Sequence, residues 1–240
     1  MRARRVGKVA QASLLLTVLT AGSASAYDPY DPRNCNGFEW DDKRALVVQK
    51  VTARPRVSFV KSPYDDDFKA ETCPASTEAC RQKAYLVAGD LVLTGKTLGS
   101  FTCISYQEKK QMWATGWLPG TALTPVAPMP SPKISDWLGT WSHPGGGVEI
   151  TRGAGGKLHI EGVMLVPAGK TTNNGVIEAQ ATPQNDTIAF VNDGSVPFEN
   201  MDEPGCRVRM QRIGPWLLVE DNGDCGGSGV TFSGLYHRKK

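Results

Sequence analysis

The stretch YLVAGDLVLTGKTLGSFTCISYQEKKQMWATGWLPGTALTPV, from Tyr85 to Val126, decides the fold that this sequence predicts. Apolar and polar residues alternate in short runs, and Gly-Asp, Gly-Lys and Leu-Gly pairs separate these runs. The pattern is typical of short antiparallel strands joined by tight turns. We therefore expect an all-β domain with strands at residues 45–51, 56–60, 91–93, 101–106, 114–118 and 122–126.

Three motifs in this half of the chain occur in the order found in bacterial SH3 domains. RVSFVKSP at residues 56–63 resembles their opening strand, YLVAGD at 85–90 resembles their L-x-x-G-D turn, and GWL at 116–118 resembles their GWV strand. Residues 45–126 therefore resemble a bacterial SH3 domain. The resemblance implies a small SH3-like barrel that binds peptidoglycan, its stem peptides or a protein partner in the cell envelope.

The same resemblance points to a set of ligand-binding candidates. SH3 relatives that bind proline-rich peptides have an aromatic residue at the position of Ala122, so the sequence argues against that ligand class. For Trp117 and Tyr106 the barrel core is the competing and favoured interpretation, because buried aromatic residues dominate small cores. Trp113, at the expected edge of a loop, is the better candidate for the surface. The candidate ligand-binding residues are Tyr64, Trp113, Trp117 and Pro119.

The second half of the chain predicts another small antiparallel β-barrel, over residues 134–240. Alternating runs are separated by turn sequences at Ala154-Gly155-Gly156, Asn173-Asn174-Gly175 and Asn192-Asp193-Gly194, which favour positive φ angles. Together with residues 137–141, the alternating runs make seven or eight strands, which is enough to close a barrel. The expected strands are residues 148–151, 157–161, 187–190, 207–211, 216–219 and 230–236.

The opening of this second half, DWLGTW at residues 136–141, resembles the Gly-x-Trp start of the calycins, the lipocalins and avidin-like barrels. In those folds an arginine of the last strand covers the tryptophan and plugs one end of the barrel. The resemblance implies this role for Arg238 over Trp141. A barrel without a ligand is the alternative interpretation, because a fold alone does not define a function.

A proline-rich stretch divides the two halves. Residues 124–132 contain four prolines, which are incompatible with a helix or a central strand and favour an extended connector. The predicted organisation is an SH3-like domain at 27–126, a linker at 127–133 and a calycin-like barrel at 134–240.

Residues 1–26 predict an export signal, with a basic start, a short apolar centre and Ala24-Ser25-Ala26 before the expected cleavage site. The apolar centre is too short to span a bilayer, so we expect no membrane span. The chain has a formal charge of +3, and four positive charges lie within residues 1–26, which leaves about −1 for residues 27–240. A nucleic-acid partner would require a basic patch, which is missing, so none is expected.

Six cysteines in an exported chain indicate disulfides, although six allow 15 pairings. Spacing favours Cys73 with Cys80 around one short loop, and Cys206 with Cys225 around a hairpin that turns at residues 213–215. Cys35 and Cys103 are left to pair with each other. The cysteines lack the regular spacing of zinc ligands, so no metal or other cofactor is expected.

The sequence shows no recognisable catalytic constellation. Residues 226–230, GGSGV, depart from G-x-S-x-G. All six cysteines are expected in disulfides, which would leave no thiolate nucleophile. His159 alternates with apolar neighbours and is interpreted as a strand residue. The predicted function is a non-enzymatic, periplasmic or secreted binding module for peptidoglycan or an envelope protein. The alternative is a secreted inhibitor or small-ligand carrier that acts through the C-terminal barrel.

Overall fold

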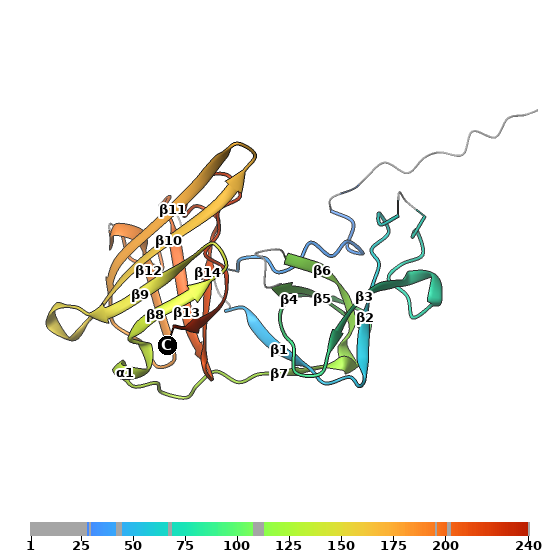
Figure 1. Ribbon diagram of the computed structural model, residues 1–240, viewed down its shortest axis with the longest axis horizontal. Coiled ribbons are helices and arrows are strands. Elements are labelled where there is room, and N and C mark those ends of the chain that lie inside the picture. Colours follow the sequence, from blue (N-terminus) through green and yellow to red (C-terminus); the bar gives the residue numbers. More distant parts are fainter. Residues whose placement is uncertain are drawn as a thin grey trace, which may run out of the picture.

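The computed structural model describes residues 28, 30–41, 45–66, 69–107, 113–194, 196–200 and 203–239. The predicted export signal at residues 1–26 lies outside this set. Nearly all regular structure in the described residues is β-strand, arranged in two antiparallel sheets that follow each other along the chain (Figure 1). The all-β class is therefore confirmed.

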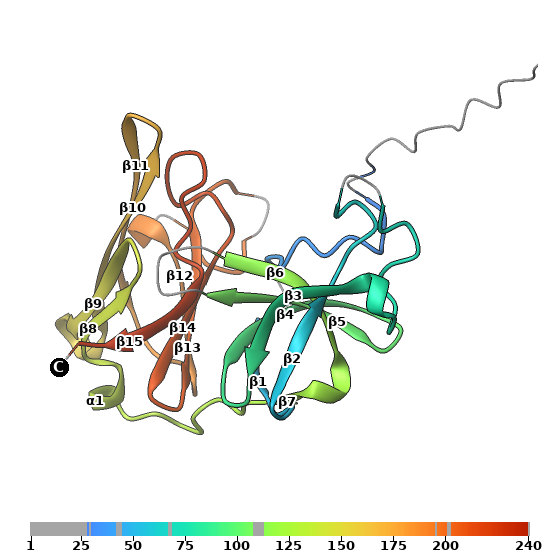
Figure 2. The same cartoon turned by 45° about the vertical axis from the view of Figure 1, so that its right-hand side comes forward.

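The first sheet has seven strands in the order β3-β2-β6-β5-β4-β1-β7 and curls into an open half-barrel (Figure 2). Two short 3₁₀ turns, η1 (Glu78–Cys80) and η2 (Gly120–Ala122), precede β3 and β7. β3 and β7 form the two edges of the sheet. The strands are β1 (Val47–Val51), β2 (Arg56–Val60), β3 (Arg81–Val87), β4 (Leu91–Leu98), β5 (Phe101–Gln107), β6 (Trp113–Pro119) and β7 (Leu123–Pro125).

The second sheet has eight strands in the order β11-β10-β9-β8-β15-β14-β13-β12, so that the last strand returns to pair with the first. A helix, α1 (Ile134–Trp137), precedes it, and the 3₁₀ turns η3 (Ala154–Gly156) and η4 (Asn192–Gly194) connect strands. The strands are β8 (Gly139–His143), β9 (Gly146–Arg152), β10 (Leu158–Ala168), β11 (Thr171–Ala181), β12 (Thr187–Val191), β13 (Arg207–Ile213), β14 (Trp216–Asp221) and β15 (Gly234–Arg238).

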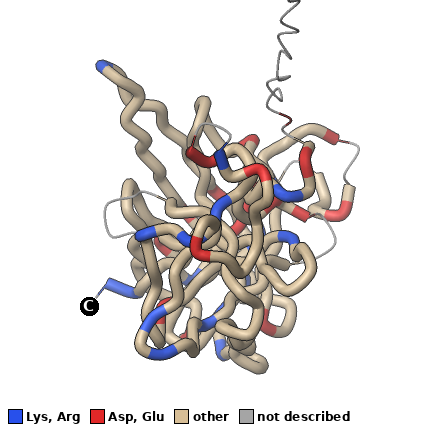
Figure 3. Tube along the Cα trace, turned by 90° about the vertical axis from the view of Figure 1, so that its right-hand side faces the viewer, with Lys and Arg blue, Asp and Glu red and all other residues tan. Residues whose placement is uncertain are grey.

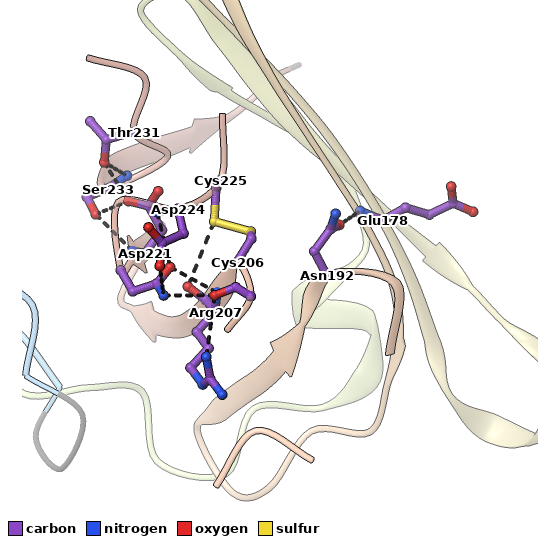
Figure 4. Close-up of a disulfide and its surroundings, with 11 residues drawn as sticks. Glu178, Asn192, Cys206, Arg207, Asp221, Asp224, Cys225, Thr231 and Ser233 are labelled. Atoms are coloured by element: carbon purple, nitrogen blue, oxygen red, sulfur yellow. Dashed lines mark hydrogen bonds between the residues drawn. A yellow bond between two sulfur atoms is a disulfide. The ribbon is translucent and has the colours of Figure 1, made fainter. Parts of the chain in front are cut away.

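The seam of this barrel lies between β11 and β12, the two ends of the strand order. The backbone N–H of Glu178 on β11 donates a hydrogen bond of 2.6 Å to Oδ1 of Asn192, which directly follows β12 (Figure 4). The contact brings the two edges together, so the sheet forms a nearly closed barrel.

One predicted turn is wrong. Asn173-Asn174-Gly175 lies inside β11, whereas the chain reverses at Gly169, whose φ is +65°. Gly175 faces the interior, where a Cβ atom would lie only 2.4 Å from the carbonyl oxygen of Cys225. Position 175 therefore requires glycine because of close packing. The sequence alone does not show whether a glycine is needed for close packing or for a positive φ angle.

The interior of the second barrel is filled by side chains. β10 and β11 alternate buried and exposed residues, whereas β13 is buried along its whole length. Trp137, Trp141, Phe232 and Tyr236 are among the fully buried side chains of its hydrophobic cluster. Eight strands enclose a space that side chains alone can fill, and this barrel follows that arrangement.

The three disulfides have the predicted pairings, which are Cys35–Cys103, Cys73–Cys80 and Cys206–Cys225. The first two lie in a buried cluster of the first domain together with Trp117, Phe101 and Val60. The third joins the residue before β13 to the loop that follows β14 (Figure 4). Each domain is thus cross-linked within itself.

The two domains share a hydrophobic interface. Six buried residues form one cluster, with Leu46, Val48 and Leu93 from the first domain and Ile213, Leu218 and Leu235 from the second. The connector also contacts the second domain, since the backbone N–H of Met129 donates to the carbonyl of Arg212 at 2.7 Å. The expected linker therefore joins domains that pack against each other.

None of the described helices has the length and apolar character needed to cross a membrane. Figure 3 shows Lys and Arg residues spread among Asp and Glu residues on the side formed by the first domain.

Candidate functional site

Trp117, one of the four predicted ligand-binding residues, is fully buried. Its indole Nε1 donates a hydrogen bond of 2.7 Å to the backbone carbonyl of Arg33. Its ring packs in the cluster that contains the Cys73–Cys80 disulfide. We therefore correct the ligand-binding assignment of Trp117, which is a core residue because no face of its ring is open to a ligand.

Two other candidates are occupied by contacts within the chain. Trp113 forms an edge-to-face contact with Phe38, with 5.3 Å between ring centres, and both pack against the interface cluster of the two domains. Tyr64 is half-buried beside Asp31. The pKa of Asp31 is held below its ordinary value mainly by hydrogen bonds from Arg33, with a smaller contribution from Tyr64.

Pro119, the fourth candidate, borders a surface groove of about 470 Å³ on the first domain. The end of β6 contributes Pro119, and the groove also has walls from β2, from the loop inside the Cys73–Cys80 disulfide and from the starts of β3 and β5. Val60 and Phe101, both buried, supply apolar surface. The structure thus gathers segments that are far apart in the sequence around one predicted residue.

Arg56, on the β2 side of the groove, is held by an aromatic neighbour. Its guanidinium carbon lies 4.6 Å from the ring centre of Tyr85. Such stacking restrains an arginine while its N–H groups stay free to donate. Within the described part of the chain, the side chain of Arg56 makes no hydrogen bond or ion pair. Its donors are therefore open to an incoming acceptor.

Arg81 supplies a second guanidinium at the start of β3. It forms an ion pair of 2.9 Å with Glu78, whose side chain is highly exposed. An exposed pair of this kind contributes little to stability and can exchange for another anion. Among the described lining residues, the groove has two arginines and no acidic side chain.

The chemistry available in this groove is recognition. Its polar side chains are Arg56, Arg81, Ser58, Ser76 and Thr77, all able to donate hydrogen bonds. The described lining contains no histidine, cysteine or carboxylate that could act as a nucleophile or general base. The arrangement favours binding of an anionic group next to an apolar one.

The sequence interpretation missed both arginines. Arg56 lies in the RVSFVKSP motif and Arg81 directly follows Cys80, but neither position carries a signal of ligand contact. The Cys73–Cys80 loop is short enough to predict from spacing, yet its docking beside β2 depends on long-range packing. Only the folded chain brings Arg56, Arg81 and Pro119 to one groove.

A separate group of ionisable side chains lies on the outer face of the second barrel. His159 and Glu161 on β10 and Glu178 on β11 place their ligand atoms within 4.8 Å of one another, a spacing that could hold a metal ion. Nε2 of His159 lies 3.0 Å from Glu161, so an ion pair also accounts for this contact. The position of His159 on a strand is as predicted.

Comparison of the chain with protein-family models, with curated proteins and with solved structures finds no match in any of the three. The resemblances to bacterial SH3 domains and to calycins therefore stay predictions that depend on their sequence motifs.

Proposed function

We propose that this chain is an exported, non-enzymatic binding protein of the bacterial envelope that recognises carboxylate-bearing peptides through the groove of its first domain. The observation that carries the proposal is the open guanidinium of Arg56, held against Tyr85 beside the apolar surface of Phe101 and Pro119. Arginine donors match a carboxylate in two-point geometry, and adjoining apolar surface can hold a neighbouring methyl or aliphatic group.

The stem peptides of peptidoglycan fit this chemistry, because they carry free carboxylates next to small apolar side chains. The resemblance of residues 45–126 to bacterial SH3 domains implies the same ligand class. An acidic segment of an envelope protein would present the same groups to the groove. The three disulfides support an oxidising compartment such as the periplasm or the extracellular space.

A carrier function inside the C-terminal barrel receives less support. Fully buried side chains, including Trp141, Phe232 and Tyr236, occupy its interior. A ligand of that domain would have to bind at its surface or displace the core.

The groove is tested by calorimetric titration of the protein with a soluble stem peptide and by sedimentation with purified peptidoglycan. We expect Arg56→Gln to weaken peptide binding by about tenfold, because the variant loses one charge-assisted hydrogen bond to the peptide. Lys83→Gln is the matched control, because Lys83 is an exposed cation on β3 outside the groove lining. Equal affinities for the wild type and Arg56→Gln, or an equal loss with Lys83→Gln, would reject the groove as the site.

A further inference from the structure

A second cleft, of about 660 Å³, lies between the two domains. The first domain contributes the turn between β3 and β4 and the end of β5, and the second contributes β8, β14 and β15. This volume is in the range of small-molecule sites, which occur preferentially at domain interfaces. The lining residues used in the argument are Asp90, Tyr106, Gln107, His143, Trp216 and His237.

Aromatic rings supply much of the wall of this cleft. Trp216 and His237 meet edge to face with 5.5 Å between ring centres, and Tyr106 lines the side of the first domain. Trp216 is only partly buried, although it packs on the interface cluster. The faces of aromatic rings carry negative potential and attract cations, and tryptophan does so more strongly than tyrosine or phenylalanine.

The charge of the cleft also selects for a cation. Asp90 is the only described lining residue with a permanent charge, and no lysine or arginine appears in that lining. One carboxylate oxygen of Asp90 accepts the backbone N–H of Val87 at 2.9 Å, which fixes the side chain at the turn. A carboxylate and aromatic rings that line the same cleft are the composition that recognises organic cations.

His143 lies on the second-domain side of the cleft, with its ring buried. It is about nine-tenths buried and stacks on Tyr236, and its Nδ1 lies 2.7 Å from the carbonyl of Pro144. Burial lowers the pKa of His143 to about 4, so the ring is neutral at physiological pH, with its proton on Nδ1. Nε2 has no partner among the described residues and is itself buried, so His143 adds no positive charge to the cleft.

The walls of the cleft are held in place by contacts between the domains. The side-chain oxygen of Gln107 accepts the backbone N–H of Leu235 at 3.2 Å, which ties β5 to β15 at the cleft. Leu91 and Trp216 also pack on the shared hydrophobic cluster. A site built on packed strands is preorganised, so a ligand loses less free energy in ordering it.

We propose that the cleft between the domains binds a small organic cation, an amine or a quaternary ammonium group, between the aromatic rings and the carboxylate of Asp90. This site is separate from the anion-binding groove of the first domain. Because both domains line the cleft, neither domain alone would form this binding site.

The test uses choline as the probe and its uncharged isostere 3,3-dimethylbutan-1-ol as the matched comparison, titrated into the mature protein at neutral pH and followed calorimetrically. We expect choline to bind about tenfold more tightly than the isostere, because only its charge differs. Equal binding of the two compounds, or no binding of choline, would overturn the proposal.

Variants locate the binding in the cleft. Asp90→Asn keeps an acceptor for the amide of Val87 and removes the charge, so we expect weaker choline binding at an unchanged denaturation midpoint. Glu161→Gln, which removes a carboxylate from the outer face of β10, is the control and should leave binding unchanged. Choline affinity that is insensitive to Asp90→Asn would contradict the site. Arg56→Gln separates the two proposals, since it should affect peptide binding alone.

Discussion

The guanidinium of Arg238 covers the indole ring of Trp141, with the guanidinium carbon 4.8 Å from the ring centre. The two residues are paired across β15 and β8, the last and first strands of the second barrel. Arg238 also donates a hydrogen bond of 2.6 Å to the backbone carbonyl of Asp136 in α1. The contact predicted from the sequence is therefore confirmed, and it fastens the chain terminus to the opening of the barrel.

Removing this contact should destabilise the second domain. We expect Arg238→Ala to lower the free energy of unfolding by about 1–2 kcal/mol, because the cation–π contact and the cover over the ring are both lost. Chemical denaturation followed by fluorescence measures the change. Lys239→Ala, which truncates the exposed neighbouring side chain, should have no effect. Equal effects of the two substitutions would show that the arginine behaves as part of a frayed terminus.

Arg212 should reduce the loss of stability caused by Arg238→Ala. Arg212 lies over Trp141 as well, with its guanidinium carbon 4.4 Å from the ring centre. Burial, and then repulsion from Arg238, lowers the pKa of Arg212 to about 10. Arg238→Ala relieves that repulsion. We therefore expect this single variant to lose less free energy of unfolding than the double variant Arg212→Ala/Arg238→Ala. A double-mutant cycle measures the coupling between the two positions.

The disulfides should differ in their contribution according to the length of chain that each one closes. Their sequence separations are 68 for Cys35–Cys103, 19 for Cys206–Cys225 and 7 for Cys73–Cys80. The chain-entropy model gives losses of about 4, 3 and 2.5 kcal/mol on removing them in that order. Thermal unfolding of the three paired Cys→Ala variants measures the ranking. The reverse ranking would mean that local packing, rather than loop closure, sets the effect.

Glu220 should make stability depend on pH. It is buried between the domains, where it accepts the backbone N–H of Leu46 and lies 3.6 Å from Arg209. Burial nevertheless raises the pKa of Glu220 to about 7. Between pH 4.5 and 7 the folded state holds a proton that the unfolded state has lost, so stability decreases as pH rises through this window, by about 3 kcal/mol.

Glu220→Gln should remove this decrease. The amide oxygen can still accept the N–H of Leu46, so the contact is kept while the titration is lost. Urea denaturation at pH values across the window measures the slope. An unchanged slope in the variant would mean that Glu220 is ionised in the folded protein throughout the window.

His143 should act in the opposite direction. Its pKa is lowered to about 4 from an ordinary value of 6.5, so below 6.5 the unfolded state binds a proton that the folded state does not. Stability therefore falls as the pH is lowered from 6.5 towards 4, by about 3 kcal/mol. His143→Phe keeps the ring against Tyr236 and abolishes the titration. Relative to the wild type, this variant and Glu220→Gln should change the pH slope with opposite signs, and like signs would refute the assignment.

Much of the fold could be predicted because its signals are local. Alternation along strands such as β10 and β11 identifies their buried face, and short spacing favours Cys73 with Cys80 and Cys206 with Cys225. Errors occurred where one sequence pattern serves two purposes. Asn173-Asn174-Gly175 has the composition of a turn, but Gly175 is small because the loop after β14 packs against it.

The candidate sites could be predicted far less well. Trp117 and Trp113 were expected as ligand contacts, but burial in the core and at the domain interface occupies them. Whether an aromatic side chain is exposed depends on what packs over it, and distant segments supply that cover. Of the four candidates, only Pro119 borders the groove that the structure forms.

The sequence by itself predicted the all-β class and favoured two disulfide pairs, because alternation and short loop closure are local properties of the chain. Cys35 was then left to pair with Cys103, and the contact of Arg238 with Trp141 was implied by the resemblance to calycins. Only the tertiary structure decided which side chains meet Arg56 at the groove, and that Asp90 and Trp216 line one cleft between the domains. These residues come from segments far apart in the chain. Their proximity depends on how the two sheets curl and pack, and neither property is encoded in a local pattern.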